Sequence, residues 1–366
     1  MQRAIELAAL GRYTTSPNPN VGAVLVLDGQ IIGEGYHQQA GGPHAEVFAL
    51  QQAGSQARGA TCYVTLEPCS HYGRTPPCAL ALIEAGVARV VVAMQDPNPQ
   101  VSGRGVKLLT KAGIQVDVGC QESAARALNP GFLHRMQRQR PWVRLKLAAS
   151  VDGAIALGNG DSKWLTGAAA REDVQLWRAQ SCAILSTART VLADQAQLNV
   201  RSNQVTPLHN GQLRQPLRVI LDRQLQLSGQ EAIFQTGGDI LLIRQAETGS
   251  EPVELSTSQR QVSVAEVALD ADNKFNLPAL LDLLASKQIN LLWVEAGSTL
   301  AAAFWQQGLV DEFVLYQAPL LLGLGALPMM PLAPFTSLTQ VKRWQWQDVC
   351  RIGDDLRLVA RLTGES

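Results

Sequence analysis

Three residues in the first 80 positions have types and spacing that suit a metal ion: His44, Cys69 and Cys78. His44 follows Pro43, and Cys78 follows a proline pair, so each stands where a helix commonly begins. The N-terminus of a helix favours negative charge, which helps thiols there to ionise. One imidazole and two thiolates suit Zn²⁺. Three protein ligands leave a fourth position for water, as in catalytic zinc sites.

Glu46 lies two residues beyond His44 and offers a carboxyl group that can carry protons to a departing amine. His44 and Glu46, followed by Pro68-Cys69 and then Cys78, match the H-x-E and P-C-x-x-C signature of zinc deaminases. The chain departs from it in one respect, because the eight residues SHYGRTPP separate the two cysteines. We predict one zinc ion per chain and assign Glu46 as the catalytic residue.

Two alternatives to a catalytic zinc site stay open for this cluster. His44 could be a surface helix residue and the cysteines small buried hydrophobic residues. The zinc could also be structural, with a fourth ligand from His37, His71 or Cys62. The combination of H-x-E with a proline-preceded cysteine pair favours the catalytic site over both.

The first 120 residues alternate between helix and strand patterns, which predicts an α/β layered domain. A hairpin is expected over 21–37, because Asp28-Gly29 between two apolar runs is a strong tight-turn signal, and it makes the sheet mixed. The predicted helices are 2–10, 44–53, 77–85 and 104–112, and the further strands are 60–68, 88–94 and 114–119.

The polar, basic segment 135–141 ends in proline, and we place a domain boundary there, giving domains 1–140 and 141–366. The α/β pattern then starts again. Strands are expected over 142–153, 182–187, 217–222, 240–244, 289–296, 312–322 and 354–362, helices over 168–179 and 298–307, and loops over 202–215 and 245–261.

Length and composition agree with two ordinary folded domains. The chain has 366 residues, with 31 Lys plus Arg against 31 Asp plus Glu, so bulk charge does not favour nucleic acid or an anionic membrane. No apolar run is long enough to span a bilayer and no secretory signal is visible, so we expect a cytoplasmic protein. We expect the remaining cysteines to be buried thiols: Cys62, Cys120, Cys182 and Cys350.

The motifs PNPNVGAVLV, HAEVFAL, TLEPCSHYGRTPPC and QDPNPQVSGRG resemble the deaminase half of the bifunctional deaminase–reductase family of riboflavin biosynthesis, which has this long spacer. The resemblance implies a cytidine-deaminase-like three-layer fold with a mixed sheet. It also implies removal of the 2-amino group from a diaminopyrimidinone that carries a ribosylamino 5-phosphate. By the same resemblance, His71, Arg74 and the segment Asp96-Pro97-Asn98 lie near the substrate.

Taken without the family, the second half indicates only an α/β domain in which Gly297, Ser298 and Thr299 open a helix suited to phosphate. The motifs KLAASVDG, GDSKWLTG, LNVR and VEAGSTLAAAF resemble the reductase half of the same family. That resemblance implies a dihydrofolate-reductase-like α/β fold that uses NADPH. The positions that match cofactor contacts are Ala148, Trp164, Thr190, Asp194, Gly297, Ser298, Thr299, Leu300, Ala301, Ala302 and Ala303, and those that match substrate contacts are Ser162, Arg178, Leu198, Arg201 and Glu295.

These residue types suit the expected roles. Arg178 and Arg201 can bind a ribose phosphate in bidentate fashion, Glu295 can accept from sugar hydroxyls, and Trp164 offers a flat apolar wall. Lys146 and Asp152 stand on or beside the first strand of the domain, where they could reach the ribose or could be structural. Two positions depart from relatives: Ala296 replaces a second glycine, and Arg223 replaces a small polar residue, so Arg223 receives no cofactor role.

The expected function is therefore zinc-dependent deamination of a phosphorylated pyrimidine followed by NADPH reduction of its ribosyl group. The expected partners are this small molecule and further copies of the chain, as a homodimer or larger assembly, with neither nucleic acid nor membrane. The enzymatic alternative is a nucleobase or tRNA deaminase with an unrelated C-terminal domain. The non-enzymatic alternative is a binding module held together by a closed zinc site.

Overall fold

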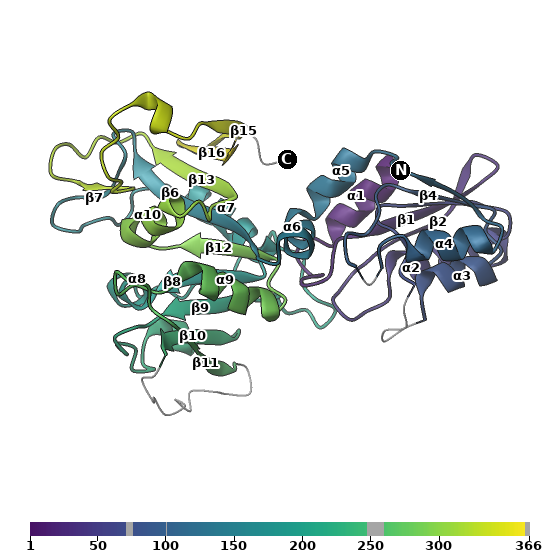
Figure 1. The fold of residues 1–366 in the computed structure, drawn as a ribbon, viewed down its shortest axis with the longest axis horizontal. Helices are drawn as coiled ribbons and strands as arrows, with labels where there is room; N and C mark the ends of the chain where they lie inside the picture. Colours follow the sequence, from purple (N-terminus) through teal and green to yellow (C-terminus); the bar gives the residue numbers. More distant parts are fainter. Residues whose placement is uncertain (71–75, 100, 247–259, 363–366) are drawn as a thin grey trace. The chain divides into compact units, whose positions relative to one another are not determined.

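The computed structural model describes residues 1–70, 76–99, 101–246 and 260–362. The chain divides into two compact units. Unit 1 comprises Met1–Arg140 and Thr206–Gln212, and unit 2 comprises Pro141–Val205 and Leu213–Ser366. Each unit has its own sheet and its own hydrophobic core (Figure 1). Within the described ranges, no helix is both long and apolar enough to cross a bilayer.

Unit 1 is built on a five-stranded mixed sheet of order β2-β1-β3-β4-β5. The strands are β1 (Gly22–Leu27), β2 (Gln30–Tyr36), β3 (Thr61–Val64), β4 (Arg89–Val92) and β5 (Gln115–Val118). β1 is antiparallel to β2 and β3, whereas β3, β4 and β5 run parallel. The predicted hairpin is confirmed. Asp28 and Gly29 have φ of 49° and 77°, the double positive φ of a turn that matches the strand twist.

Helices cover both faces of this sheet and make three layers. They are α1 (Gln2–Leu10), α2 (Ala45–Ala53), α3 (Cys78–Glu84), α4 (Arg104–Lys111), α5 (Glu122–Leu128) and α6 (Pro130–Arg138), with a short 3-10 helix, η1 (Gly54–Ala57). Because successive strand side chains point to opposite faces, Ala23 and Leu25 of β1 join the core under α2 to α4, and Val24 packs against α1.

Several of the expected element boundaries are wrong, and the strand expected over 142–153, for example, ends at Ser150. Residues 135–138 belong to α6, so the polar connection is confined to 139–141. Its basic side chains obscured the buried Leu133, which packs with Leu66 and Met94. The strand expected over 60–68 ends at Val64, the one over 312–322 ends at Ala318, and the loop expected over 245–261 gives up its first residue to a strand. Most of that loop, residues 247–259, lies outside the described residues.

Unit 2 is built on a nine-stranded sheet of order β11-β10-β9-β8-β12-β6-β13-β16-β15. The strands are β6 (Trp142–Ser150), β8 (Ala183–Thr187), β9 (Leu217–Leu221), β10 (Ile240–Gln245), β11 (Val262–Val267), β12 (Leu291–Glu295), β13 (Glu312–Ala318), β15 (Trp344–Ile352) and β16 (Asp355–Leu362). The seven strands from β11 to β13 are parallel, and β16 and β15 add antiparallel to their edge. β7 (Ala154–Ala156) and β14 (Leu327–Pro328) form a separate pair.

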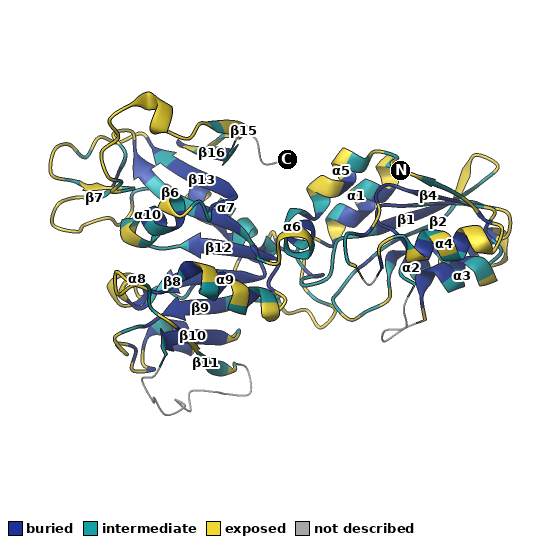
Figure 2. Cartoon of the chain, in the orientation of Figure 1, coloured by how far each residue is buried: buried dark blue, intermediate teal, exposed yellow. Residues whose placement is uncertain are grey.

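Apart from the edge strand β11, the parallel strands of unit 2 are mostly buried, as Figure 2 shows, because helices lie on both faces. The helices are α7 (Ala168–Gln180), α8 (Ala188–Asp194), α9 (Leu277–Ser286) and α10 (Ser298–Gln306), with 3-10 helices η2 (Ala232–Gln235) and η3 (Leu338–Gln340). α9 and α10 contribute to one core and α7 and α8 to the other. The carboxyl ends of parallel strands are the usual binding edge in such sheets.

Candidate active sites

The three predicted metal ligands come together in unit 1. His44 is the N-cap of α2, Cys69 follows β3 through Pro68, and Cys78 is the first residue of α3. One ligand atom from each lies within 4.8 Å of the others. In the described part of the chain, this is the one group of three His, Cys, Asp or Glu side chains that could hold a metal ion.

The distances fit zinc. Nδ1 of His44 lies 3.6 Å from Sγ of Cys69 and 3.3 Å from Sγ of Cys78. A tetrahedral zinc with Zn–S near 2.3 Å and Zn–N near 2.0 Å separates nitrogen from sulfur by about 3.5 Å. The backbone N–H of Cys78 donates to Sγ of Cys69 at 3.2 Å, so the start of α3 stabilises negative charge on that sulfur.

A close approach of two segments fixes Cys69. A Cβ added to Gly105 of α4 would lie 2.1 Å from the carbonyl oxygen of Pro68, so only glycine fits there. The carbonyl of Cys69 also accepts from the N–H of Ala79 in α3 at 3.1 Å. The segment that carries Cys69 is therefore held between α3 and α4.

The two thiols differ in acidity. Hydrogen bonding to Cys78 and His44 lowers the pKa of Cys69 to about 4, whereas donating to Cys69 and burial raise the pKa of Cys78. Without a metal ion, the pair shares one proton between two adjacent sulfurs. A divalent cation would displace that proton, since the thiolate is the form that binds metal.

Glu46 lies in the first turn of α2 and is 3% exposed. Burial raises its pKa to about 6, and the nearby His44 opposes that rise. A carboxyl group with a pKa near neutrality can both accept and release a proton under working conditions. The structure thus places a buried carboxyl group beside the three candidate ligands.

The candidates for a fourth ligand do not join the cluster. Nδ1 of His37 lies 2.9 Å from the carbonyl oxygen of Pro43, and its Nε2 lies 3.1 Å from Nδ2 of Asn18. Cys62 is fully buried in the core of unit 1 and is absent from the ligand group. A closed site completed by His37 or Cys62 is therefore wrong. His71, together with Arg74, lies outside the described residues.

The carboxylate of Glu67, two residues before Cys69, holds backbone groups of Asp96, Gly103 and Val106. Glu67, 4% exposed, accepts from the backbone N–H groups of Asp96 at 3.2 Å, Gly103 at 3.0 Å and Val106 at 3.1 Å. Oδ1 of Asp96 accepts from the N–H of Asn98 at 2.8 Å. Glu67 therefore ties the predicted substrate segment to the strand end that leads to Cys69.

A cleft of about 1240 Å³ opens in unit 2. It is lined from the carboxyl ends of β6, β8, β9 and β12 and from the starts of α8 and α10. Fifteen of the sixteen residues predicted to bind cofactor or substrate line this cleft; the exception is Ala301, which is buried in the core beneath α10. α10 begins at Ser298 with Gly297 as its N-cap, as predicted.

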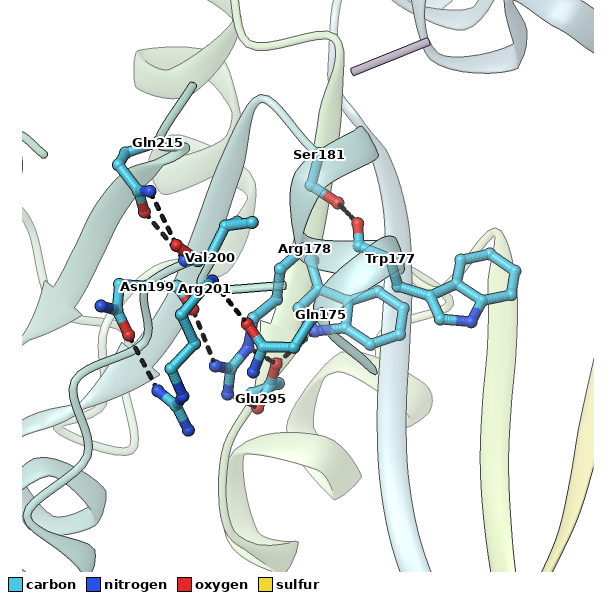
Figure 3. A network of polar contacts seen from close by, with 10 residues as sticks. Gln175, Trp177, Arg178, Ser181, Asn199, Val200, Arg201, Gln215 and Glu295 are labelled. Atoms are coloured by element: carbon cyan, nitrogen blue, oxygen red, sulfur yellow. Dashed lines mark hydrogen bonds and ion pairs between the residues drawn. The ribbon is translucent and has the colours of Figure 1, made fainter. Parts of the chain in front are cut away.

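Arg178 and Glu295 form a bidentate ion pair at the floor of the cleft (Figure 3). Nε and Nη2 of Arg178 donate to the two carboxylate oxygens at 2.6 and 2.8 Å, and Nε1 of Trp293 donates to Oε1 at 2.5 Å. The guanidinium lowers the pKa of Glu295 to about 2 against the opposing effect of burial. The donor fork of Arg178 faces this carboxylate, whereas we expected it to face a phosphate.

Three other predicted residues differ in their surroundings. Trp164 lines the cleft and is 71% exposed, with the guanidinium of Arg171 4.5 Å from its ring centre. Lys146 lines the cleft with Nζ 5.9 Å from the ring centre of Tyr316, and burial lowers its pKa. Asp152 does not line the cleft. Its carboxylate accepts from the N–H groups of Leu322 and Gly323, so it fixes a loop instead.

The remaining cysteines are free thiols, but two are less buried than expected. Cys62 and Cys182 are buried, whereas Cys120 and Cys350 are half-buried. Cys350 lies on β15, the outermost strand of the nine-stranded sheet.

Comparison with known proteins adds two family matches. The cytidine and deoxycytidylate deaminase zinc-binding region matches residues 1–94, and the RibD C-terminal domain matches residues 141–358. The riboflavin biosynthesis protein RibD of Haemophilus influenzae is 49% identical over 363 residues, which cover 98% of this chain and 95% of that protein. The Escherichia coli protein of that name is also 49% identical, over 98% of this chain and 97% of its own length.

This chain belongs to the RibD family. Among solved structures, Acinetobacter baumannii RibD is similar with a TM-score of 0.88 and 48% identity over 99% of this chain and 97% of that one. A Thermotoga maritima diaminohydroxyphosphoribosylaminopyrimidine deaminase/5-amino-6-(5-phosphoribosylamino)uracil reductase has a TM-score of 0.84 and 34% identity, again over 99% and 97%.

As a member of this family, the chain is a bifunctional deaminase and reductase of riboflavin biosynthesis, with a cytidine-deaminase-like domain and a RibD C-terminal domain. The alternatives of an unrelated C-terminal domain and of a non-enzymatic module are therefore wrong. Sequence reasoning missed several polar residues of the RibD cleft, including Gln175, Lys163 and Arg189. Gln175 carries no motif, and its role depends on a loop 26 residues away in the chain.

Proposed function

We propose that residues 1–140 deaminate 2,5-diamino-6-(5-phosphoribosylamino)pyrimidin-4(3H)-one. Residues 141–366 then reduce the resulting 5-amino-6-(5-phosphoribosylamino)uracil with NADPH. The observation that carries the proposal is the cluster of His44, Cys69 and Cys78 beside the buried Glu46. The relative from Thermotoga maritima bears the names of both activities.

In the deaminase, His44, Cys69 and Cys78 would hold one zinc ion, which would supply Lewis acidity for the attack of water on the ring carbon that bears the amine. Glu46 removes a proton from that water and delivers it to the departing amine, which leaves as ammonia. Glu67 keeps the segment of Asp96 in place near the substrate. We also propose that Arg74 and His71 lie near the substrate, on the family resemblance alone.

In the reductase, the cleft would hold NADPH, which would supply a hydride for the reduction of C1′ of the opened ribosyl group. We assign its binding to Ala148, Trp164, Thr190, Asp194 and the start of α10 from Gly297 to Ala303, and substrate binding to Ser162, Arg178, Leu198, Arg201 and Glu295. Arg178 orients the carboxylate of Glu295 toward sugar hydroxyls. Arg201 meets the phosphate, because its side chain is exposed in the cleft.

Glu46→Gln tests the deaminase assignment. The amide cannot carry the proton, so ammonia release should fall by a factor on the order of 10³ while zinc content and NADPH-dependent reduction stay unchanged. Glu84→Gln, at an exposed position of α3, is the matched control and should keep the full deaminase rate. A purified Glu46→Gln enzyme that releases ammonia at the wild-type rate would refute the role of Glu46.

We also propose that the chain forms a homodimer or larger assembly. Trp346 and Val349 on the edge strand β15 are 56% and 57% exposed, a large apolar surface for an outermost strand. Sedimentation of the purified chain tests this, and Trp346→Lys should shift the distribution toward monomer.

A further inference from the structure

The segment 195–202 carries two of the proposed substrate ligands, Leu198 and Arg201, into the cleft of unit 2. It belongs to no helix or strand, so regular backbone pairing does not hold it. Leu198 has a φ of 52°, in the left-handed region that non-glycine residues rarely adopt. The surrounding side chains must therefore fix the conformation of this segment.

Two glutamine side chains hold the backbone just before and at Arg201 (Figure 3). Gln215 makes two hydrogen bonds to the backbone of Val200. The N–H of Val200 donates to Oε1 of Gln215 at 2.8 Å, and Nε2 of Gln215 donates to the carbonyl of Val200 at 2.9 Å. Gln175 of α7 accepts from the N–H of Arg201 through Oε1 at 3.1 Å. Together they fix the orientation of two successive peptide groups.

Two arginines complete this set of contacts from the other side. Nη1 of Arg178 donates to the carbonyl of Asn199 at 3.2 Å, and Nη1 of Arg218 donates to the carbonyl of Gln197 at 3.3 Å. Both arginines have other strong partners: Glu295 for Arg178 and a set of carbonyls that includes Ile233 for Arg218. The amide groups of Gln175 and Gln215 bond to this segment, whereas the two guanidinium groups are shared with other partners.

Burial makes these contacts hard to replace with water. Val200 is 3% exposed and Gln175 is 5% exposed. A buried backbone N–H that loses its acceptor is costly, so the loop would move to recover a partner. Such a move would displace the adjacent Arg201, whose Nη1 is already directed by Oδ1 of Asn199 at 2.9 Å.

We propose that Gln175 and Gln215 are positioning residues of the reductase: by holding the peptide groups of Val200 and Arg201, they aim the guanidinium of Arg201 at the phosphate of the substrate. The inference rests on the proposed function, because it takes Arg201 as the phosphate ligand. Neither glutamine needs to touch the substrate. Their effect on turnover is therefore a matter of binding and not of chemistry.

The test compares Gln215→Leu and Gln175→Leu in the full chain, using the phosphorylated substrate and its dephosphorylated counterpart. The KM for the phosphorylated substrate should rise roughly ten-fold, because each variant removes partly buried hydrogen bonds that set the geometry of Arg201. The kcat should stay within about two-fold. The KM for the dephosphorylated substrate should not change, which a general loss of folded enzyme would not reproduce.

Conservative variants guard against misfolding. Gln175→Glu keeps an acceptor for the N–H of Arg201 and should restore most of the affinity. Gln215→Glu keeps the acceptor for Val200 but loses the donor, and should give an intermediate KM. Gln340→Leu is the matched control, because Gln340 accepts from the N–H of Thr336 at 3.1 Å in a loop that does not line the cleft.

Arg201→Ala distinguishes the phosphate-binding role of Arg201 from the positioning role of the two glutamines. If it raises the KM for the phosphorylated substrate alone while every glutamine variant leaves that KM unchanged, the positioning role is overturned and the phosphate role stands. If Arg201→Ala affects both substrates equally, the phosphate role is wrong and the positioning proposal fails with it. The deaminase rate of each preparation gives the concentration of active chain.

Discussion

The two sites of this RibD chain are built on different principles. In unit 1, three ligands and one carboxyl group lie within a few ångströms at the starts of two helices and the end of one strand. In unit 2, a cleft of about 1240 Å³ collects side chains from residues between 146 and 331. A metal centre needs few residues of fixed type. A site for two large ligands needs many residues, and their contribution to binding depends on the shape of the cleft.

The residue types divide in the same way. All five histidines lie in unit 1, including His209 in the segment Thr206–Gln212, and all seven tryptophans lie in unit 2. Metal and proton chemistry favour the imidazole, while flat apolar surfaces for ligands and cores favour the indole. Tryptophan fluorescence consequently reports on the reductase unit alone.

The largest expected effect breaks the metal centre and leaves the cleft intact. Cys69→Ala should abolish zinc binding and lower the deaminase rate by a factor on the order of 10³ or more, with reduction unchanged. Zinc content and both rates are measured on one preparation. Cys62→Ala is the control, because that thiol is fully buried in the same unit but is no ligand, and it should keep one zinc per chain.

The ion pair in the cleft should make the stability of the reductase unit depend on pH. The pKa of Glu295 falls from 4.5 to about 2 on folding, so its stabilising effect is complete above about pH 4.5 and disappears as the pH falls toward 2. That effect amounts to about 3 kcal/mol. Glu295→Gln should therefore destabilise unit 2 most at neutral pH and progressively less at acid pH.

Urea unfolding followed by tryptophan fluorescence at several pH values measures this difference. Glu266→Gln, on an exposed position of β11, should show no such trend. A gap between wild type and Glu295→Gln that stays constant from pH 7 to pH 3 would contradict the role assigned to the ion pair.

A smaller effect sharpens the description of the cleft. Trp164→Ala should weaken NADPH binding by roughly ten-fold, because an aromatic wall contributes about 1 kcal/mol beyond its buried area. Phe335→Ala is the control, since Phe335 is an aromatic residue that is 51% exposed and does not line the cleft. Equilibrium titration with NADPH measures both, and equal affinities for the two variants would remove Trp164 from the site.

The smallest expected effect concerns how much an exposed ion pair away from both sites contributes to stability. Arg89 and Asp117 form an ion pair of 2.6 Å between β4 and β5, with side chains 42% and 45% exposed. Asp117→Asn should change the stability of unit 1 by less than about 1 kcal/mol, because water screens such pairs. Thermal unfolding followed by circular dichroism should show a correspondingly small shift, with both activities unchanged.

The sequence predicted that His44, Cys69 and Cys78 come together, and the structure confirms this cluster. His44, Glu46, Cys69 and Cys78 were identifiable because zinc chemistry restricts both residue type and local position, and the helix starts that present them are marked by proline. The hairpin at Asp28-Gly29 was equally clear, since its turn demands positive φ. Helices α5, α6, α8 and α9 were not predicted; in α5 and α6, charged side chains hide the few residues that they bury.

The residues of the cleft were predicted only by the family resemblance. The hydrogen-bonded pairs within the cleft were not predicted. The sequence gives no sign that Arg178 faces Glu295, 117 residues further on, or that Gln215 reaches Val200. The sequence alone determined which atoms could hold zinc and carry a proton, because that chemistry is local. Tertiary structure alone decided which polar side chains meet across the cleft, because the order of parallel strands, and not their distance in the chain, sets those neighbours.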